Sequence, residues 1–310
     1  EITGEDKYVK SATSVYKKLW RDNPDKGLIT THIGAGTDSY YEYIIKSYLM
    51  TGGVGKEMLH RHILMMNDIK SKLVFKTINQ ELVGIGAKSR SKYPDAEVEH
   101  LATFAGGMIA LGSVKNNENH EEDLKLASDV TTTYAKTYAA FKSGIMPEHV
   151  EYNVRNENDK EDIKMVVDGY ILRPETVESI FYLYRFTGDQ KFRDYNWQIF
   201  KAINKSCRVE NGFTSITKLQ HDPEDVRHRD EMESFFLAET LKYLYLTFTD
   251  SSLISPTEWV FNTEAHPLHM WNKDTIEKFS NEIDIQISKS LNREKIREIE
   301  PRRRKLKDDN

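Results

Sequence analysis

The chain contains 310 residues, of which 30% are charged, and its formal net charge is −5. This length allows a sizeable core in one large domain or two ordinary ones. The balanced charge gives no global reason to expect nucleic-acid binding, and no apolar run reaches the roughly 18 residues of a membrane helix. Cys207 is the only cysteine, so cysteine usage cannot reveal the redox compartment.

The first strongly periodic segment covers residues 38–50. Its three- and four-residue spacing predicts a helix with one apolar stripe, made of Tyr40, Tyr43, Ile44 and Tyr48. Ser39 and Glu42 have the spacing of a capping box, so we expect this helix to start beside Asp38.

Three later segments begin with polar and acidic residues and then become apolar nearly all round, which is typical of buried helices: 99–113, 172–185 and 230–248. Amphipathic helices are predicted between and before them, at 56–73, 121–142 and 191–207. Alternating buried and half-buried helices at a long period indicate a solenoid or a closed ring. In a closed ring, the acidic starts of the inner helices would meet at one mouth.

The repeated acidic starts suggest a cavity lined by carboxylates: Asp38, Glu42, Glu99, Glu175, Glu178, Glu233 and Glu239. Burying so many carboxylates costs several kcal/mol each unless they are paired, hydrogen-bonded or bound to a cation. Such a cavity suits polyhydroxylated ligands, metal ions or hydrolysis by two carboxylates. The alternative interpretation is that these carboxylates are ordinary solvent-exposed residues at the starts of helices.

The segment 259–271 begins with three apolar residues. From Asn262 onward it contains short polar residues without a helical period. One interpretation is a simple turn, which Asn and Pro favour. The other is a loop that enters the ring, where Thr263 would offer a hydroxyl and a carbonyl oxygen to calcium.

The character of the chain changes after about residue 271, where large apolar residues become rare. We therefore divide the sequence into a main domain, 1–275, and a polar tail, 276–310, with a basic cluster at residues 302–305. A solvated helical or disordered tail is one interpretation, and contact with a polyanion or a membrane surface is the other.

Six segments resemble, in order, the signature blocks of glycoside hydrolase family 47, the class I α-1,2-mannosidases: residues 34–46, 99–107, 144–148, 170–189, 230–248 and 261–268. The resemblance covers roughly residues 28–271. It implies an all-α fold, the closed (α/α)7 barrel plugged by a C-terminal hairpin. It also implies calcium-dependent, inverting hydrolysis of α-1,2-linked mannose from high-mannose N-glycans.

The resemblance also implies roles for individual residues. Asp38 corresponds to the residue that protonates the leaving oxygen, and Glu175 to the base that activates water. Thr263 corresponds to the calcium ligand, through its hydroxyl and carbonyl oxygens. The remaining pocket residues that it implies bind substrate: His100, Arg173, Glu178, Phe235, Glu239 and Glu264.

Several departures from the family pattern qualify this expectation. A further catalytic glutamate on an early helix has no counterpart, so we expect the C-terminal part of the catalytic domain, with about three N-terminal helix pairs missing and the isolated chain inactive. The two cysteines of the usual disulfide are replaced by Thr103 and Tyr134, and Gly36 replaces a larger pocket residue. A non-catalytic glycan-binding or quality-control protein is therefore the alternative function.

Family members work in the endoplasmic reticulum or Golgi lumen, usually behind an N-terminal membrane anchor. By resemblance we expect that compartment for this chain, with N-glycans on glycoproteins as partners, no nucleic acid, and membrane contact only through an anchor outside the given sequence.

Overall fold

The computed structural model describes residues 5–114, 119–219 and 226–272. Its helices are α1 (Asp6–Asp22), α2 (Asp38–Met50), α3 (Lys56–Lys72), α4 (Ala105–Ser113), α5 (His120–Ala140), α6 (Glu175–Thr187), α7 (Gln190–Ser206) and α8 (Leu241–Phe248). A 3-10 turn, η1 (His100–Phe104), leads into α4, and a π-helical turn, η3 (Phe236–Thr240), leads into α8.

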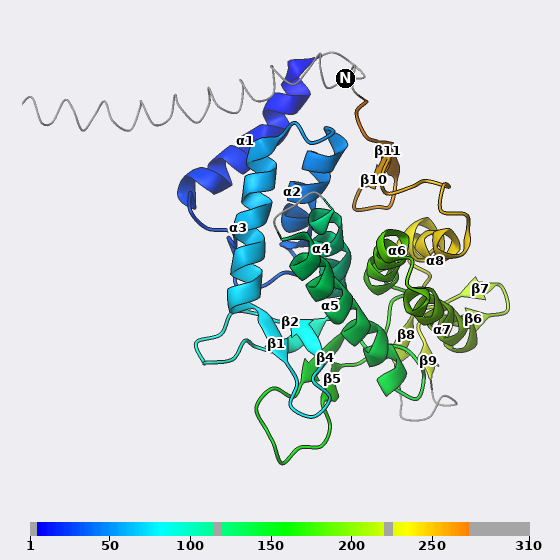
Figure 1. Ribbon diagram of the computed structural model, residues 1–310. Helices are drawn as coiled ribbons and strands as arrows, with labels where there is room; N and C mark the ends of the chain where they lie inside the picture. The colour runs from blue at the N-terminus through cyan, green and yellow to red at the C-terminus, as the bar shows by residue number, and fades with distance from the viewer. Residues whose placement is uncertain (1–4, 115–118, 220–225, 273–310) are drawn as a thin grey trace, which may run out of the picture.

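Four helices form the inner layer of an arc. Helix α2 packs on α4, α4 on α6, and α6 on α8 (Figure 1). The outer helices cover this layer, with α3 on α2, α5 on α4 and α6, and α7 on α6 and α8. The predicted alternation of buried and half-buried helices is confirmed, and the architecture is a partial α/α toroid.

Small residues allow the inner helices to approach each other closely. All nine residues of α4 are buried. A Cβ atom at Gly107 would lie 3.1 Å from Cα of Ser179 on α6, so a side chain there would force the helices apart. The Ser179 hydroxyl accepts a 2.8 Å hydrogen bond from the Gly107 N–H and donates another to the carbonyl of Thr103.

The start of α2 differs in detail from the prediction. The helix begins at Asp38 as expected, but Thr37 occupies the N-cap and no side chain caps the helix, so the predicted capping box is wrong. The predicted stripe is also displaced, because Tyr40, Tyr43 and Tyr48 are only half-buried. The face that packs into the core instead contains Tyr41, Ile44, Ile45 and Leu49.

Two other predicted helices begin later than expected. Residues 99–104 form the end of a strand and the 3-10 turn before α4, so Glu99 does not head an α-helix. Residues 230–233 also precede the helical turns that lead into α8, which leaves Glu233 outside them. The polar starts of these segments are thus connecting chain, whereas Glu175 is the first residue of α6.

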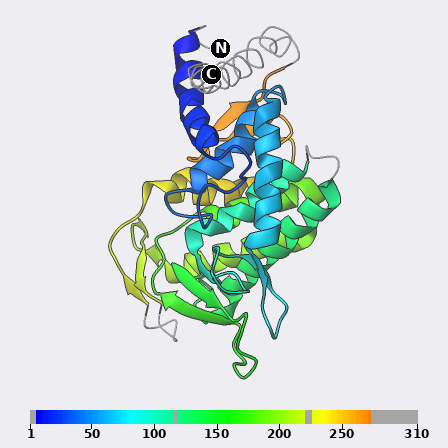
Figure 2. The same ribbon diagram turned by 90° about the vertical axis from the view of Figure 1, so that its left-hand side faces the viewer.

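Short antiparallel strands, which the sequence analysis does not predict, gather mainly at one end of the helices (Figures 1 and 2). They are β1 (Val74–Lys76) with β2 (Val83–Ile85), β3 (Glu97–Glu99) with β4 (His149–Tyr152) and β5 (Ile163–Val167), β6 (Arg208–Val209) with β7 (Gly212–Phe213), and β8 (Ile216–Lys218) with β9 (Arg227–His228). At the other end, β10 (Trp259–Phe261) and β11 (Pro267–His269) form a hairpin beside α2.

Hydrogen-bonding side chains occupy the two positions, Thr103 and Tyr134, to which the sequence resemblance assigns a disulfide. Thr103 and Tyr134 are fully buried. The hydroxyls of Thr103 and Thr176 lie 2.8 Å apart, and the Tyr134 hydroxyl accepts a bond from the N–H of Ile85. At both positions the side chain therefore has a hydrogen-bond partner inside the core.

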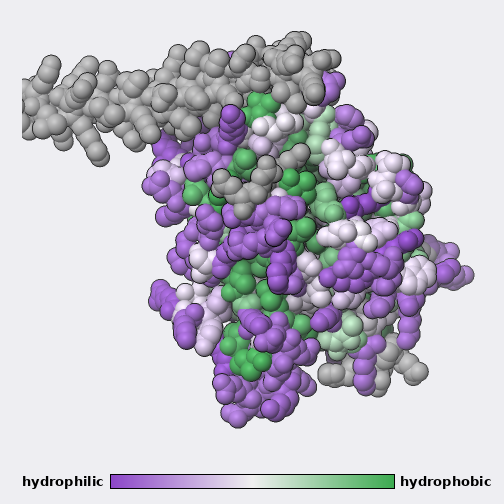
Figure 3. Space-filling model, viewed as in Figure 1, coloured by the Kyte–Doolittle hydropathy of each residue, from purple (hydrophilic) through white to green (hydrophobic). Residues whose placement is uncertain are grey.

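Hydrophilic side chains cover most of the face seen in Figure 3, with apolar side chains emerging in small patches between them. Within the described ranges, no helix combines the length and apolar character needed to cross a membrane. The predicted tail, 276–310, and its basic cluster lie outside the described residues.

Candidate active site

Helix α2 places Asp38 at its first residue and Glu42 one turn later. The loop before the helix turns sharply at Gly36, whose φ of +80° lies in the left-handed region that favours glycine. The carboxylate of Glu99 accepts a hydrogen bond from the N–H of Ala35 and so fastens this loop. Asp38 is half-buried and Glu42 is buried.

Helix α6 brings a second pair of carboxylates, Glu175 and Glu178, into its first turn. Carboxylates are favoured there by the partial positive charge of a helix N-terminus. Arg173 precedes the helix, and its Nε donates a 2.8 Å bond to Glu148. Its Nη1 lies 3.8 Å from Oε1 of Glu175, so a held guanidinium flanks that carboxylate.

His100 lies behind Glu175 rather than at the surface of the site. It is fully buried, its Nδ1 lies 3.2 Å from Oε2 of Glu175, and its Nε2 lies 2.6 Å from the hydroxyl of Tyr138. The position suits a residue that orients the carboxylate.

The π-helical turn η3 supplies Glu239, which is buried. Single π-turns are frequent at functional sites. Burial raises the pKa of Glu239 to about 8, and the neighbouring carboxylates of Glu178 and Glu264 add to the shift. Burial also raises the pKa of Glu178 to about 7, although Lys46 opposes the shift.

The loop between β10 and β11 carries Thr263 and Glu264, both exposed. Asn262 shapes it, because its side-chain oxygen accepts bonds from the N–H groups of Glu264 and His266. The N–H of Thr263 donates to the hydroxyl of Tyr43 on α2, at 3.2 Å, which ties the loop to the start of the arc.

These elements meet around one hollow of about 190 Å³. Its lining residues are Asp38, Glu42, Leu101, Phe104, Arg173, Pro174, Glu175, Glu178, Phe235, Glu239, Thr263 and Glu264. All the predicted site residues except His100 are among them. Two further acidic positions from the sequence analysis, Glu99 and Glu233, are not.

The donor set fits a hard divalent cation. No group of three or more His, Cys, Asp and Glu side chains in the described ranges is placed to hold a metal on its own. Calcium, however, also accepts hydroxyl and carbonyl oxygens and water, which Thr263 and the open hollow can provide. Burial is the main cause of the raised pKa values of Glu178 and Glu239, and neighbouring carboxylates raise both further, so a cation in this space would favour their ionised forms.

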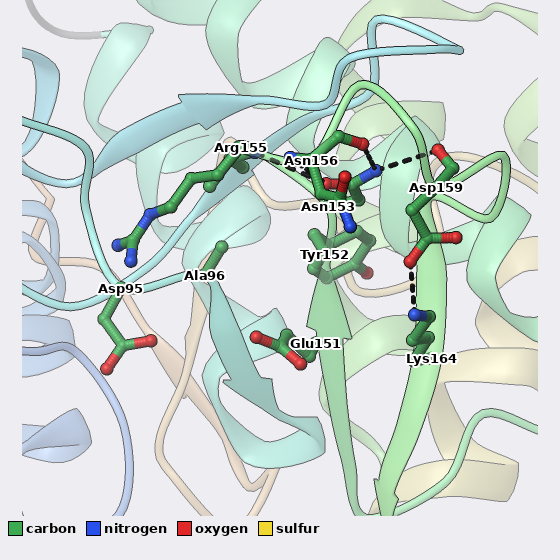
Figure 4. A pocket seen from close by; sticks show the side chains of 10 residues that line it. Asp95, Ala96, Glu151, Tyr152, Asn153, Arg155, Asn156, Asp159 and Lys164 are labelled. Carbon is green, nitrogen blue, oxygen red and sulfur yellow. Dashed lines mark hydrogen bonds and ion pairs between the residues drawn. The ribbon is translucent and has the colours of Figure 1, made fainter.

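A second hollow, of about 250 Å³, lies beside β4 and β5 (Figure 4). Its polar groups bond to one another: the side chain of Asn153 donates to the carbonyls of Asn156 and Asp159, and Lys164 pairs with Asp159. These contacts occupy part of its polar wall, whereas the predicted site residues gather in the carboxylate-lined hollow, which is therefore the candidate site.

The sequence analysis did not identify several residues that organise the site. Glu148 holds Arg173, Tyr138 contacts His100, and Lys46 lies between Glu42 and Glu178. Only long-range contacts reveal these roles. A lysine within the apolar face of 38–50 was the one available signal, because Lys is rarely buried without a partner.

The fold and the site together define an α/α toroid with acidic inner-helix starts facing a shared hollow. The family model of glycosyl hydrolase family 47 matches residues 1–270, and the chain belongs to this family.

Relatives of this chain include proteins named as mannosidases. The human endoplasmic reticulum mannosyl-oligosaccharide 1,2-alpha-mannosidase is 37% identical over 77% of this chain and 34% of its own length. Mannosyl-oligosaccharide 1,2-alpha-mannosidase mans-2 of Caenorhabditis elegans is 39% identical over 79% of this chain and 42% of its own. The chain thus spans less than half the length of these relatives.

The solved structure of alpha-1,2-mannosidase from Trichoderma reesei matches the fold with a TM-score of 0.71 and 29% identity. The match covers 78% of this chain and 53% of the Trichoderma chain. The partial toroid therefore corresponds to about half of that structure.

Proposed function

We propose that this chain forms part of an inverting, calcium-dependent α-1,2-mannosidase that trims high-mannose N-glycans in the endoplasmic reticulum or Golgi lumen. The observation that supports this most strongly is the convergence of Asp38, Glu175 and Thr263, from three distant parts of the sequence, on one hollow. The names of the relatives support the substrate and the compartment.

Glu175 is suited to the role of base. Its carboxylate is held between the guanidinium of Arg173 and the imidazole of His100, so its position is defined before substrate arrives. It would take a proton from the water that attacks the anomeric carbon. Inversion requires room for this water between the two participating carboxyl groups, and α2 and α6 each supply such a group to the hollow.

Asp38 is suited to deliver a proton towards the leaving oxygen, either directly or through water. Glu178, Glu239 and Glu264 can accept hydrogen bonds from sugar hydroxyls, and the ring of Phe235 offers an apolar surface to the sugar C–H groups. The further catalytic glutamate that the resemblance implies has no counterpart in this sequence, so we propose that the 310 residues alone do not turn over substrate.

Thr263 would hold the calcium ion through its hydroxyl and carbonyl oxygens, with waters completing the shell. When bound, calcium would supply a positive charge that orients sugar hydroxyls and water in the hollow.

One observation favours a second candidate function, a non-catalytic glycan-binding protein. A Cβ atom at Gly36, two residues before Asp38, would meet nothing within 4 Å, and this open space would leave room for a wider range of glycans.

Binding of 1-deoxymannojirimycin to the chain, measured by calorimetry with and without calcium, tests the proposed function. We expect calcium-dependent binding that Glu239→Gln weakens. Mannose release by the longest expressed form of the protein distinguishes the two candidates: binding without release supports the second, and absence of calcium-dependent binding contradicts both.

A further inference from the structure

Lys46 is a cation buried inside the acidic wall of the hollow. It follows Glu42 by one turn of α2, and only 3% of the residue is exposed. Its Nζ contacts Oε1 of Glu42 and lies 3.4 Å from Oε1 of Glu178 on α6. Burying an ammonium group costs several kcal/mol unless it is paired, so this double pairing defines where Lys46 lies.

Glu42 and Glu178 each direct their Oε1 atom at the ammonium group of Lys46. Oε1 of Glu178 also accepts a 3.1 Å bond from the hydroxyl of Tyr243 on α8. In the described part of the chain, no hydrogen bond engages Oε2 of Glu42 or Glu178, and both residues line the hollow. One oxygen of each carboxylate is therefore held from behind, and the other remains to accept a bond from a ligand.

The surroundings of Lys46 give it a strong electrostatic effect. Besides Glu42 and Glu178, the titratable groups near it are Tyr182 of α6 and, behind Glu178, Tyr243. Helix α4, which packs on α2, carries no titratable side chain. Glu239 of η3 adds a third carboxylate to the hollow, close enough for Glu178 and Glu42 to contribute to its raised pKa.

We propose that Lys46 is a positioning residue of this pocket, whose ammonium favours the ionised forms of Glu42 and Glu178 and holds them in place so that their remaining oxygens accept hydrogen bonds from a polyhydroxylated ligand. The proposal rests on the proposed function for the nature of the ligand. Without the lysine, two buried carboxylates would face each other, and at least one would take up a proton. A neutral carboxyl group presents an O–H donor where the ligand hydroxyl needs an acceptor.

The opposing effects on Glu178 agree with this role. Burial is the largest influence and raises the pKa of Glu178, and Glu42 raises it further, whereas Lys46 lowers it. The pKa of Lys46 itself is raised well above its ordinary value, because the nearby carboxylates outweigh its burial. The lysine therefore stays charged throughout the range in which Glu178 titrates.

A double-mutant cycle on the 310-residue chain tests the proposal. The pH midpoint of the Glu178 carboxyl would be followed by carbon-13 NMR in the wild type, Lys46→Met, Glu42→Gln and the double variant. We expect the loss of the cation to raise the Glu178 midpoint by about 1 to 3 pH units in each background. Lys46→Arg should restore it to within about half a unit of the wild type.

Lys46→Met alone leaves two buried carboxylates without their cation and could prevent folding. The double variant with Glu42→Gln contains only one of these carboxylates, so the comparison with Glu42→Gln alone still decides the test. Lys70→Met is the matched control, since Lys70 pairs with Glu122 and Asp123 on the outer helices and should leave the Glu178 midpoint unchanged. A Glu178 midpoint that is the same in Glu42→Gln and the double variant would overturn the proposal and leave Lys46 a purely structural ion pair.

Ligand binding adds a second readout. The pH profile for 1-deoxymannojirimycin should move upward by the same amount as the Glu178 midpoint in the Lys46→Met variants. An unmoved profile beside a moved midpoint would contradict the positioning role. If the wild-type chain binds none of this probe, the proposed function fails, whereas the carboxyl titration still decides whether Lys46 controls the ionisation of Glu178.

Discussion

Oε2 of Glu175 lies 3.2 Å from Nδ1 of His100, whose other ring nitrogen lies 2.6 Å from the hydroxyl of Tyr138. Burial raises the pKa of Tyr138 well above its ordinary value, so the hydroxyl stays protonated and can donate to Nε2. The Nδ1–H group is then directed at Glu175. In this arrangement the buried tyrosine favours the tautomer in which His100 donates to the proposed base.

Tyr138→Phe should remove this control at modest structural cost. Losing one buried hydrogen bond costs about 1 to 3 kcal/mol of the free energy of unfolding, which urea denaturation measures. Tyr152→Phe is a matched control, because the hydroxyl of Tyr152 lies 2.6 Å from that of Thr137, outside the residues that line the hollow. Both variants should lose similar stability, but only Tyr138→Phe should weaken binding of 1-deoxymannojirimycin. Equal binding by both would contradict the tautomer argument.

Glu239 should make the chain less stable as pH rises. Its pKa in the folded state is raised from 4.5 to about 8, so the folded chain binds more protons than the unfolded chain between these values. Its contribution is fully present below about pH 4.5 and is lost as pH rises through 8. Relative to wild type, Glu239→Gln should flatten the fall in unfolding free energy between pH 5 and 8. The exposed Glu157→Gln should not, and a wild-type slope in Glu239→Gln would contradict the assignment.

His62 should have the opposite effect at lower pH. It is fully buried, neither ring nitrogen has a hydrogen-bond partner in the described ranges, and burial lowers its pKa from 6.5 to about 4. Between these pH values the unfolded chain binds a proton at His62 and the folded chain does not. The free energy of unfolding therefore decreases as pH falls from 6.5 to 4. This loss is about 3 kcal/mol at most. His62→Met should reduce it, measured by urea denaturation at both pH values. The exposed His60→Met on the same helix should not.

The calcium assignment predicts a specific effect at Thr263. Thr263→Val keeps the shape of the side chain but removes the hydroxyl oxygen, so calcium affinity measured by calorimetry should fall about tenfold or more, equivalent to ~1.4 kcal/mol. Thr217→Val is the control, because Thr217 lies in β8 and its hydroxyl bonds to Arg227. Calcium affinity that is unchanged in Thr263→Val would remove this residue from the metal site.

The helical frame could be predicted from the sequence, because buried and half-buried helices leave different periodicities over many residues. The outer helix α3, for example, ends within one residue of its predicted range, 56–73. The strands could not be predicted, because segments of two to five residues such as β6 and β3 carry too little pattern. The apolar stripe of α2 was predicted on the wrong face. The helix contains four tyrosines and two isoleucines, and two neighbouring faces show almost the same three- and four-residue spacing.

The acidic residues of the hollow were recognisable because they precede apolar runs and match family blocks. Their partners were not, because pairing depends on the packing of distant segments. His100 illustrates the limit: the sequence places it beside Glu99, but folding puts its ring against Glu175, 75 residues further along the chain. Whether these residues perform the proposed roles remains a prediction.

The most direct test replaces Glu175 with Gln in the longest expressed form of the protein and measures mannose release from a high-mannose N-glycan alongside binding of 1-deoxymannojirimycin. The amide keeps the size of the side chain but cannot take a proton from water. The account predicts that mannose release disappears while inhibitor binding persists. Undiminished release by Glu175→Gln would contradict it.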